Sequence, residues 1–459
     1  MGRALDLAPR GARRRRQDVV TSLDLTDSVP APIGPVRVVR PEVDAPLPEW
    51  PFMLMIAWLP LWFVLGLSGF TWIIFAAPMA ASLVRRRGLV LPKGFGFWVV
   101  FLVAVGGSVF SIDSAPRLSG WVLRTGYYVA VTVFLIYLLN GKEGVPVRTI
   151  IRGFTYLWLA TVAGGYLAFL VGDLGFRSPM AYLMPAGLLQ NELIRTMVTP
   201  SFADLQDIIG FPVPRPKAPF PYTNSWGSML ALLTPFAFMS LTDPRVGLSP
   251  KLIRFALLAS IIPGVISLNR GLWLSLGIGL VYAAIRFGVG GDSKAIRNSF
   301  LALIFVALLF TITPLGDVIV TRIDTGHSNN DRFELVVDAI DGTMERPVFG
   351  WGAPRPNDRH LPSVGTHGQA WFVMFSYGFV GAIGYVGMFA TMLWRTRRQP
   401  TAVGLWAHVV ILVGMVQMAF YLHVPHQMFV MMAAVAVALR LQASTLGDDS
   451  FAHRSRLGS

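Results

Sequence analysis

The sequence predicts an all-α, polytopic membrane protein with about twelve transmembrane helices and both termini in the cytoplasm. With 54% hydrophobic and only 14% charged residues, and a mean hydropathy of +0.56, the 459-residue chain is too apolar for a soluble multidomain protein. From about residue 50 onward, apolar runs alternate with polar connections, and each run is close to the ~20 residues that cross hydrocarbon as a helix.

The first 48 residues differ in composition from the rest of the chain. The stretches "RGARRRRQDVV" and "VPAPIGPVRVVRPEVDAPLP" carry no helical apolar period, which predicts a disordered, basic cytoplasmic tail over residues 1–48. Polar residues follow the basic run where a signal peptide would have an apolar core, so this is not a signal peptide. We expect its arginine run, 13–16, to hold the tail near anionic lipid.

The transmembrane domain is predicted over residues 49–443, followed by a cytoplasmic C-terminal tail, 444–459. The expected spans are centred near residues 58, 77, 103, 130, 162, 233, 261, 279, 308, 382, 411 and 434. The connections after the even-numbered spans are short and basic, as the positive-inside rule requires of cytoplasmic loops. Their Lys and Arg residues are Arg85, Arg86, Arg87, Lys142, Arg148, Arg152, Arg245, Lys251, Lys294, Arg297, Arg395, Arg397 and Arg398.

This topology places two long connections, residues 173–223 and 317–368, on the extracytoplasmic side. Loops of this length with mixed charge and several prolines usually carry function, so we expect the active face to be extracytoplasmic. The chain has no Walker-type loop, no dinucleotide fingerprint and no cytoplasmic Asp-x-Asp motif. These features argue against an ATP-driven pump and against an enzyme that uses sugar nucleotides from the cytoplasm.

The charge and cysteine counts narrow the partners further. The net charge of +14 is explained by loop positions, so membrane lipids rather than nucleic acid are the expected partner. Cysteine is absent, which rules out a disulfide framework, a thiolate metal site and a cysteine nucleophile. We predict no metal site and no cofactor.

Two arginines stand out in the outer connections. Arg270, in "SLNRGLWLSL", ends a very tight turn between two spans, where it is either a snorkelling anchor or a clamp for a phosphate. Arg332, in "HSNNDRFELVVDAIDGTMERPVFGWG", falls in the first turn of a predicted amphipathic helix that Gly342 should end. Its charge opposes the helix dipole there, which indicates a role beyond the helix, with pairing to Asp331 as the alternative.

A histidine opens a late apolar run, "HGQAWFVMFSYGFVG". His367 and Gly368 are followed by nine residues and then Gly378-Phe-Val-Gly381, and these glycines should let the span pack tightly against a neighbour. In order with the two arginine motifs and "RPVFGWG", this pattern resembles the O-antigen ligase and polymerase superfamily of bacterial envelope polysaccharide assembly. The resemblance covers roughly the last 250 residues and extends to Asn224 in "PFPYTNSWGSMLALL". Gly368 and Asn269 depart from the residues usual at those positions.

The resemblance implies a glycosyltransferase that is inverting, independent of metal, and active at the extracytoplasmic face of the cytoplasmic membrane. Its donor would be a glycan on polyprenyl diphosphate and its acceptor a hydroxyl of a glycan or glycolipid, as in a polymerase or a ligase. Arg270 and Arg332 would stabilise the leaving diphosphate. His367 would act as the base that takes the acceptor's proton.

Further polar residues are candidates for substrate binding, each with a structural alternative. Arg124 is a possible second diphosphate contact, and solvated loop charge is the alternative for the others: Arg195, Arg215, Lys217 and His360. His423 and His426 flank Pro425, which argues against a helical metal motif. His408 lies in mid-span, where a satisfied hydrogen bond inside the bundle is expected.

A secondary transporter or a flippase for lipid-linked glycans fits the same hydropathy. A transporter usually has ionisable residues near mid-membrane and an internal repeat of halves. The spans contain few acids and no repeat is evident, which favours the enzyme.

Overall fold

A computed structural model describes residues 45–86, 88–207, 212–291, 297, 327–356, 363–423 and 425–455, with side chains outside 327–333 and 445–455. The chain divides into two units, Met1–Asp44 and Ala45–Ser459. The first unit, which holds most of the predicted disordered tail, lies outside the described residues, and so does the span predicted near residue 308. The second unit contains all of the described helices and strands.

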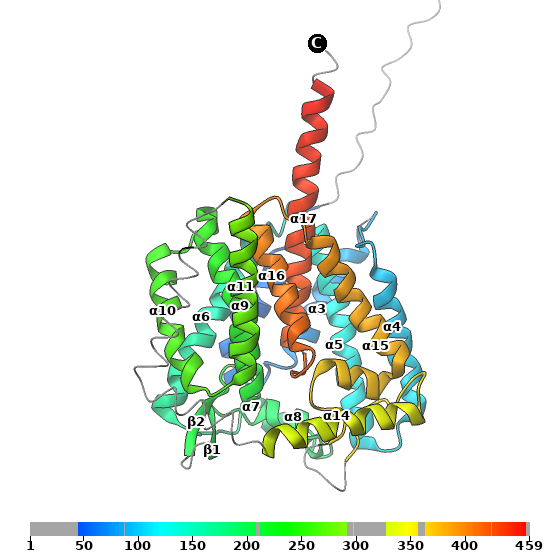
Figure 1. Ribbon diagram of the computed structural model, residues 1–459. Helices are drawn as coiled ribbons and strands as arrows, with labels where there is room; N and C mark the ends of the chain where they lie inside the picture. The colour runs from blue at the N-terminus through cyan, green and yellow to red at the C-terminus, as the bar shows by residue number, and fades with distance from the viewer. Residues whose placement is uncertain are drawn as a thin grey trace, which may run out of the picture. The chain divides into compact units, whose positions relative to one another are not determined.

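The second unit is mostly helical (Figure 1). Its one described sheet is an antiparallel hairpin of β1 (Ala203–Asp207) and β2 (Pro212–Pro216), paired from Ala203 with Pro216 to Asp207 with Pro212. The helices are α1 (Trp50–Ala57), α2 (Leu59–Val64), α3 (Thr71–Val84), α4 (Phe95–Gly107), η1 (Ser108–Ser111), α5 (Ala115–Asn140), α6 (Val147–Val171), α7 (Pro179–Leu183), η2 (Leu188–Gln190), α8 (Glu192–Val198), α9 (Thr223–Thr242), η3 (Pro244–Val246), α10 (Pro250–Ile266), α11 (Arg270–Val289), α14 (His327–Glu345), α15 (Gln369–Thr396), α16 (Ala402–Gln417) and α17 (His426–Ser455).

Five of the described helices are long and apolar enough to cross a membrane: α5, α6, α11, α15 and the His426–Ser444 part of α17. This confirms the helical class and the membrane character that the sequence predicts, while the count of twelve spans stays a prediction. The helices α3, α4, α9, α10 and α16 cover further predicted centres. The span expected near residue 58 is not one continuous helix, because Pro60 has no N–H to continue α1 and a second short helix begins at Leu59.

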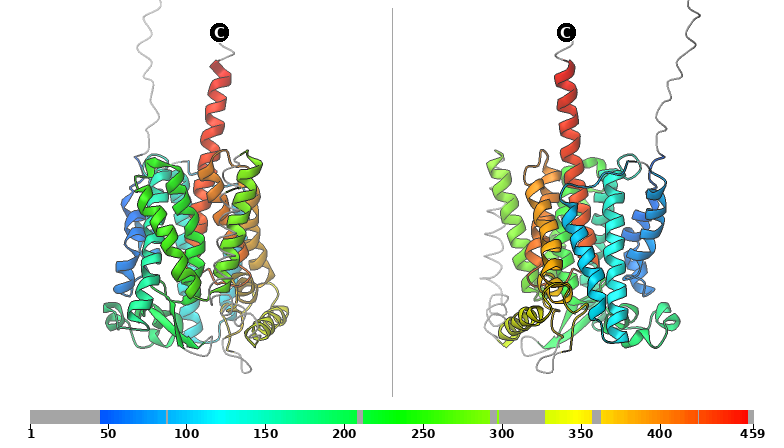
Figure 2. Two further views of the ribbon diagram at one scale, coloured as in Figure 1. Left: turned by 60° about the vertical axis from the view of Figure 1, so that its left-hand side comes forward. Right: turned by 90° about the vertical axis from the view of Figure 1, so that its right-hand side faces the viewer.

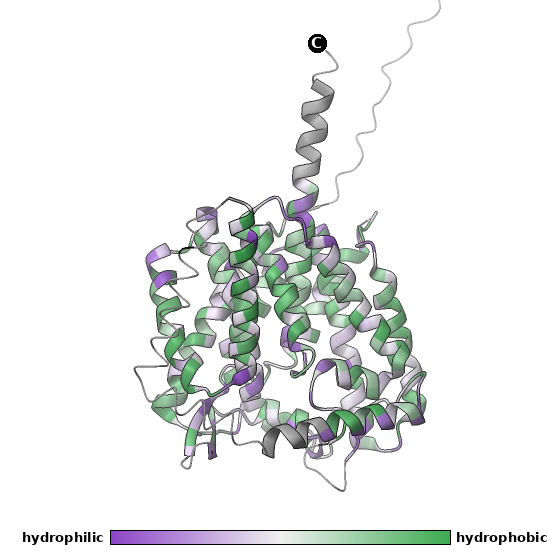
Figure 3. Cartoon of the chain, in the orientation of Figure 1, coloured by the Kyte–Doolittle hydropathy of each residue, from purple (hydrophilic) through white to green (hydrophobic). Residues whose placement is uncertain are grey.

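The bundle is held by close contacts between helices distant in the sequence. The helix α15 packs against α4, and Gly384 allows this approach, since a Cβ there would stand 2.6 Å from the Phe101 amide nitrogen. A buried polar network joins α9, α16 and α11: Ser228 donates to Gln417 Oε1 at 2.6 Å, and Gln417 Nε2 donates to Ser275 Oγ at 3.0 Å. Apolar residues cover most of the helix surfaces, and polar residues gather toward the two ends of the bundle (Figure 3).

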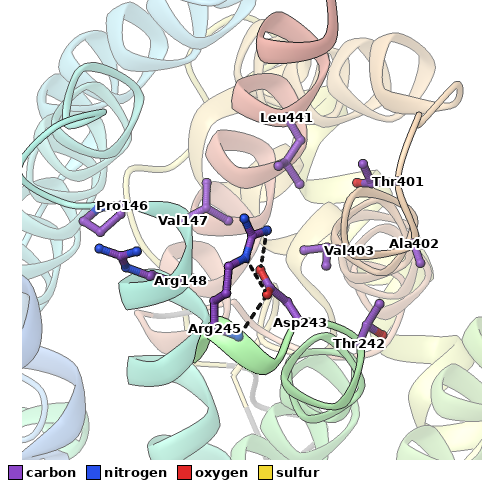
Figure 4. A pocket seen from close by; sticks show the side chains of 10 residues that line it. All are labelled: Pro146, Val147, Arg148, Thr242, Asp243, Arg245, Thr401, Ala402, Val403 and Leu441. Atoms are coloured by element: carbon purple, nitrogen blue, oxygen red, sulfur yellow. Dashed lines mark hydrogen bonds and ion pairs between the residues drawn. The ribbon is translucent and has the colours of Figure 1, made fainter. Parts of the chain in front are cut away.

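The basic connections assigned to the cytoplasm lie together at one end of the bundle as far as the structure describes them, and Lys294 lies outside the described residues. Arg440 of α17 donates to the Val145 carbonyl at 2.8 Å, and Arg395 in the last turn of α15 donates to the Lys93 carbonyl at 2.8 Å. A cavity of about 360 Å³ at this end is lined by residues 146–148, 242–245, 401–403 and 441, with Arg245 paired to Asp243 (Figure 4). Connections predicted to share a membrane face therefore share an end of the bundle.

The long outer connections lie at the other end. The helices α7, α8 and α14 and the hairpin β1–β2 gather there, away from the C-terminal end of α17 (Figures 1 and 2). The helix α14 runs past Gly342 to Glu345, contrary to the predicted end, because Gly342 stays helical and packs close to the Phe375 ring. Its buried face is Leu335, Ala339 and Thr343, so much of the expected apolar stripe, including Val337 and Ile340, is exposed.

Candidate functional site

A cavity of about 1050 Å³ occupies the end of the bundle where the long connections meet. Its wall combines the first turns of α5 and α9, the segment 190–193, strand β1, residues 353–356 and 363–367, and the turn 419–422. Three residues predicted as site residues line it, namely His367, Arg124 and Asn224. Both long outer connections thus contribute to one polar cavity.

The position of His367 is set by the start of α15. The amides of Gln369 and Ala370, which have no partner within the helix, donate to the carbonyls of Tyr421 and Met418 at 2.8 and 2.9 Å. Gly368 has φ +118°, and a Cβ there would stand 2.6 Å from the Ala419 oxygen. Only glycine suits this position, and the close approach holds His367 near the turn 419–422.

The hydrogen bonds around His367 favour one neutral tautomer. The Thr366 hydroxyl donates to the Ser363 carbonyl at 2.7 Å and lies 3.3 Å from His367 Nδ1. Because the hydroxyl's single hydrogen is committed to the shorter bond, Nδ1–H is the donor in the second. The neutral ring then carries its lone pair on Nε2, as a general base requires.

The signature glycine Gly378 breaks α15 below the histidine. Its φ of +68° interrupts the helix, and the chain segment 347–352 lies in the gap. Phe379 N–H donates to the Pro347 carbonyl at 2.8 Å, while Trp351 and Gly352 donate to the carbonyls of Phe375 and Ser376. The second outer connection therefore satisfies the backbone groups that the break exposes, and Gly378 packs against this connection rather than against a neighbouring span.

Of the two arginines in the cavity wall, Arg124 of α5 makes fewer interactions with the protein. Its guanidinium lies 5.3 Å from the centre of the Phe372 ring. Across the described ranges, no hydrogen bond or ion pair of this side chain is found, and no carboxylate lies within salt-bridge distance. A half-buried guanidinium without a counter-charge favours binding of an anion.

Sequence reasoning missed a second arginine in the wall, Arg117. It donates to the carbonyls of Trp351 at 2.7 Å, Ala353 at 3.0 Å and Pro354 at 3.3 Å, and also to Asp113 Oδ1. Arg355 donates to the other Asp113 oxygen at 2.6 Å. These bonds from Arg117 and then Arg355 lower the pKa of Asp113 from 3.8 to about 2. The cluster fastens the second outer connection to the start of α5.

Arg270 is not among the residues that line the cavity. It is half-buried at the first position of α11. Its neighbour Asn269 caps this helix by accepting from Leu272 N–H at 3.2 Å, accepts from the Tyr421 hydroxyl, and has Nδ2 3.5 Å from the Thr223 carbonyl. Asn269, a departure from the family pattern, thus ties α11 to two lining residues.

The cations of the first outer connection are placed differently from one another. Arg215 and Lys217, predicted to contact substrate, are buried, and their side chains bond Gln206 and Asp204. Neither residue lines the cavity, and their role as substrate contacts stays a prediction. Arg195 is exposed on α8 and interacts electrostatically with Tyr222, a lining residue, so its role stays a prediction.

Two predicted site residues fall outside what the structure describes. His360 lies in the undescribed segment 357–362, and the side chain of Arg332 is not described. Position 332 is one helical turn before Val336 of α14, which lines the cavity.

Three other histidines with described side chains, His408, His423 and His426, are buried. His408 bonds Thr396 Oγ1 and the Tyr282 hydroxyl, both at 2.9 Å, as expected for a satisfied residue inside the bundle. His423 and His426 are buried against the base of the site, His426 with its ring centre 5.2 Å from that of Trp72. Among residues with described side chains, no group of three His, Cys, Asp or Glu could hold a metal.

The fold and the site together define a mostly helical protein with helices long and apolar enough to cross a membrane, and with a cavity at one end of the bundle. A scan against protein-family models gives no match, and a search of curated proteins finds no significantly similar sequence.

Proposed function

We propose that the protein is an inverting, metal-independent glycosyltransferase of the cytoplasmic membrane. It transfers a glycan from polyprenyl diphosphate to a hydroxyl acceptor at the extracytoplasmic face, as a polysaccharide polymerase or ligase. The observation that carries the proposal joins two residues of one cavity wall: Arg124, a guanidinium without a counter-charge among the described residues, and His367, an imidazole with Nδ1 beside the Thr366 hydroxyl.

The anionic part of the donor suits the Arg124 side of the cavity. A diphosphate leaving group carries its negative charge into the transition state, where a fixed guanidinium stabilises it without a proton or a metal. The first turn of α9, residues 223–225, lines the same cavity, and Tyr222 makes no side-chain cap there. Amide groups and the helix dipole at this end add to the attraction for phosphate oxygens.

The residues of the cavity can account for each bond and proton of the transfer step. The acceptor oxygen attacks the anomeric carbon, the bond from that carbon to the diphosphate oxygen breaks, and the configuration inverts. His367 Nε2 takes the acceptor's proton, and the diphosphate leaves as an anion held by Arg124. Arg270 and Arg332 are the candidates for a second cation on the diphosphate, as the family resemblance suggests.

The direct test is transfer by purified protein. We expect incubation with a polyprenyl diphosphate oligosaccharide and candidate acceptors to yield, by mass spectrometry, a longer lipid-linked chain for a polymerase or a transferred glycan for a ligase. His367→Ala should bind the donor as the wild type does but lose transfer, whereas Ser444→Ala, an exposed control at the other end of the bundle, should keep both activities.

Two outcomes would replace this proposal. If wild-type protein binds the donor but transfers to no acceptor, the enzyme assignment fails. If proteoliposomes then move the lipid-linked glycan across the bilayer and His367→Ala does so equally well, the protein is a flippase.

A further inference from the structure

The strand β1 presents two polar side chains to the cavity. Asp204 and Gln206 alternate with Leu205, so the two polar residues share one face of the strand and both line the cavity. Leu205 points to the opposite face and is 48% exposed. We propose that Asp204 and Gln206 form a binding subsite for the hydroxyl groups of a neutral glycan; this rests on the proposed function and extends it.

Buried cations orient both side chains. Arg215 Nη1 bonds Gln206 Oε1 at 2.6 Å, and since a guanidinium only donates, the amide oxygen must face it and the amide NH₂ remains to donate elsewhere. Lys217 Nζ donates to Asp204 Oδ1 at 3.0 Å, while the Asp204 side chain stays 40% exposed. The strand therefore offers one fixed hydrogen-bond donor and one fixed acceptor, about 7 Å apart along the backbone.

The strand β2, which supports these groups, is stiff before any ligand binds. Pro212, Pro214 and Pro216 have fixed φ angles and no N–H, so β2 is stiff and cannot pair with a further strand. Arg215 Nε also donates to the Ser267 carbonyl at 3.0 Å, which anchors β2 to the turn before α11. A preorganised donor and acceptor lose little conformational entropy on binding a ligand.

The charges select the chemical class of ligand. Arg215 and Lys217 already bond Gln206 and Asp204, so the part of the cavity wall formed by β1 does not offer them to a phosphate. Asp204 and the neighbouring lining residue Glu192 would repel a carboxylate. Carboxylate and amide groups do hydrogen-bond hydroxyls well, so an uncharged sugar fits and a diphosphate or a uronic acid does not.

The inference can be tested by separating glycan binding from diphosphate binding. The glycan probe is a panel of immobilised neutral oligosaccharides beside uronic-acid oligosaccharides, and the second probe is undecaprenyl diphosphate without sugar. Gln206→Ala and the double variant Asp204→Ala/Lys217→Ala should each lose about tenfold in affinity for the neutral glycans. The double variant leaves no unpaired buried lysine, so folding is protected. Leu205→Ala is the matched control and should bind as the wild type does.

The second probe completes the comparison. The hairpin variants should bind undecaprenyl diphosphate within about twofold of the wild type, whereas Arg124→Ala should lose that affinity and keep neutral-glycan binding. The subsite is refuted if wild-type protein binds no neutral glycan, if the hairpin variants bind as the wild type does, or if uronic-acid glycans bind equally well.

The subsite and the proposed transfer can fail separately. Neutral-glycan binding that depends on Asp204 and Gln206 in a protein that transfers nothing would support the subsite and remove the enzyme assignment. Transfer by a protein whose hairpin variants keep full glycan affinity would do the opposite.

Discussion

Gly378 lies directly against the backbone of Val348: a Cβ on Gly378 would stand 2.3 Å from the Val348 carbonyl oxygen. The break in α15 and the docking of segment 347–352 therefore depend on each other. His367 directly precedes Gly368, the N-cap of the same helix, so its position in the cavity depends on the contact as well.

Gly378→Ala should destabilise the protein by roughly 2 kcal/mol or more, because alanine is strained at φ +68° and its Cβ meets fixed backbone. Thermal unfolding in detergent and the transfer assay should both show the loss. Gly277→Ala in α11, where nothing lies within 4 Å of the added Cβ, is the matched control and should be neutral. Equal melting temperatures for the two variants would show that the contact is dispensable.

Arg124→Lys should bind sugar-free polyprenyl diphosphate with an affinity between those of the wild type and Arg124→Ala, because lysine keeps the charge but not the paired donors. Lys217→Met is the comparison, since its ammonium already bonds Asp204. We expect it to change diphosphate affinity by less than about twofold. Titration with the lipid measures all three variants, and a larger loss for Lys217→Met than for Arg124→Lys would reverse the assignment.

The cluster of Asp113 with Arg117 and Arg355 should make docking of the second outer connection sensitive to acid. The pKa of Asp113 is lowered from 3.8 to about 2, so its contribution to stability is full above pH 3.8 and is lost as the pH falls through about 2. As the pH falls through that interval, the amides of residues 351–355 should lose protection from hydrogen exchange relative to their intrinsic exchange rates. Asp113→Asn should already show the faster exchange at neutral pH. Identical exchange in this variant and the wild type at pH 7 would contradict the role of Asp113 in holding the second outer connection.

Gln417→Leu should cost about 1–3 kcal/mol, because Ser228 and Ser275 lose their shared partner inside the bundle. Adding Ser228→Ala removes a hydroxyl left without its acceptor, and adding Ser275→Ala removes one that still donates to the Gly271 carbonyl at 2.6 Å; together they should recover part of the loss. Thermal unfolding of the single and triple variants gives the comparison. A triple variant less stable than the single one would mean that the hydroxyls act independently of Gln417.

The absence of cysteine from the chain makes a topology test direct. Ser363→Cys places the thiol in the wall of the 1050 Å³ cavity, and Thr401→Cys places it in the wall of the 360 Å³ cavity at the other end of the bundle. We expect an impermeant maleimide to label Ser363→Cys from outside intact cells and Thr401→Cys only after permeabilisation. Labelling of both positions from the same side would refute the assigned orientation.

The parts of the site that sequence reasoning found are those with a local signal. His367, Arg124 and Asn224 each sit at the start of an apolar run or just inside one, and the alternation of runs predicts that these starts share a membrane face. Their convergence on one cavity follows from that topology. The membrane character followed from composition alone.

What the sequence could not reveal depends on partners far away along the chain. Arg117 acts on carbonyls 234 to 237 residues later, and no periodicity encodes that pairing. Arg215 and Lys217 look like substrate contacts in the sequence because it shows their charge and not their neighbours Gln206 and Asp204. The φ of +118° at Gly368, which requires glycine, likewise depends on the fold and has no signal in the sequence.

The bonds from Arg117 to residues 351–354 also bear on how the protein is made. Arg117 leaves the ribosome more than two hundred residues before its partners, and α15, which holds segment 347–352 in place, follows still later. The rim of the cavity therefore closes only after α15 has been inserted into the bilayer. A nascent chain that is released before that point can contain the early helices in full and yet have no site, so biogenesis itself delays the appearance of binding until the bundle is nearly complete.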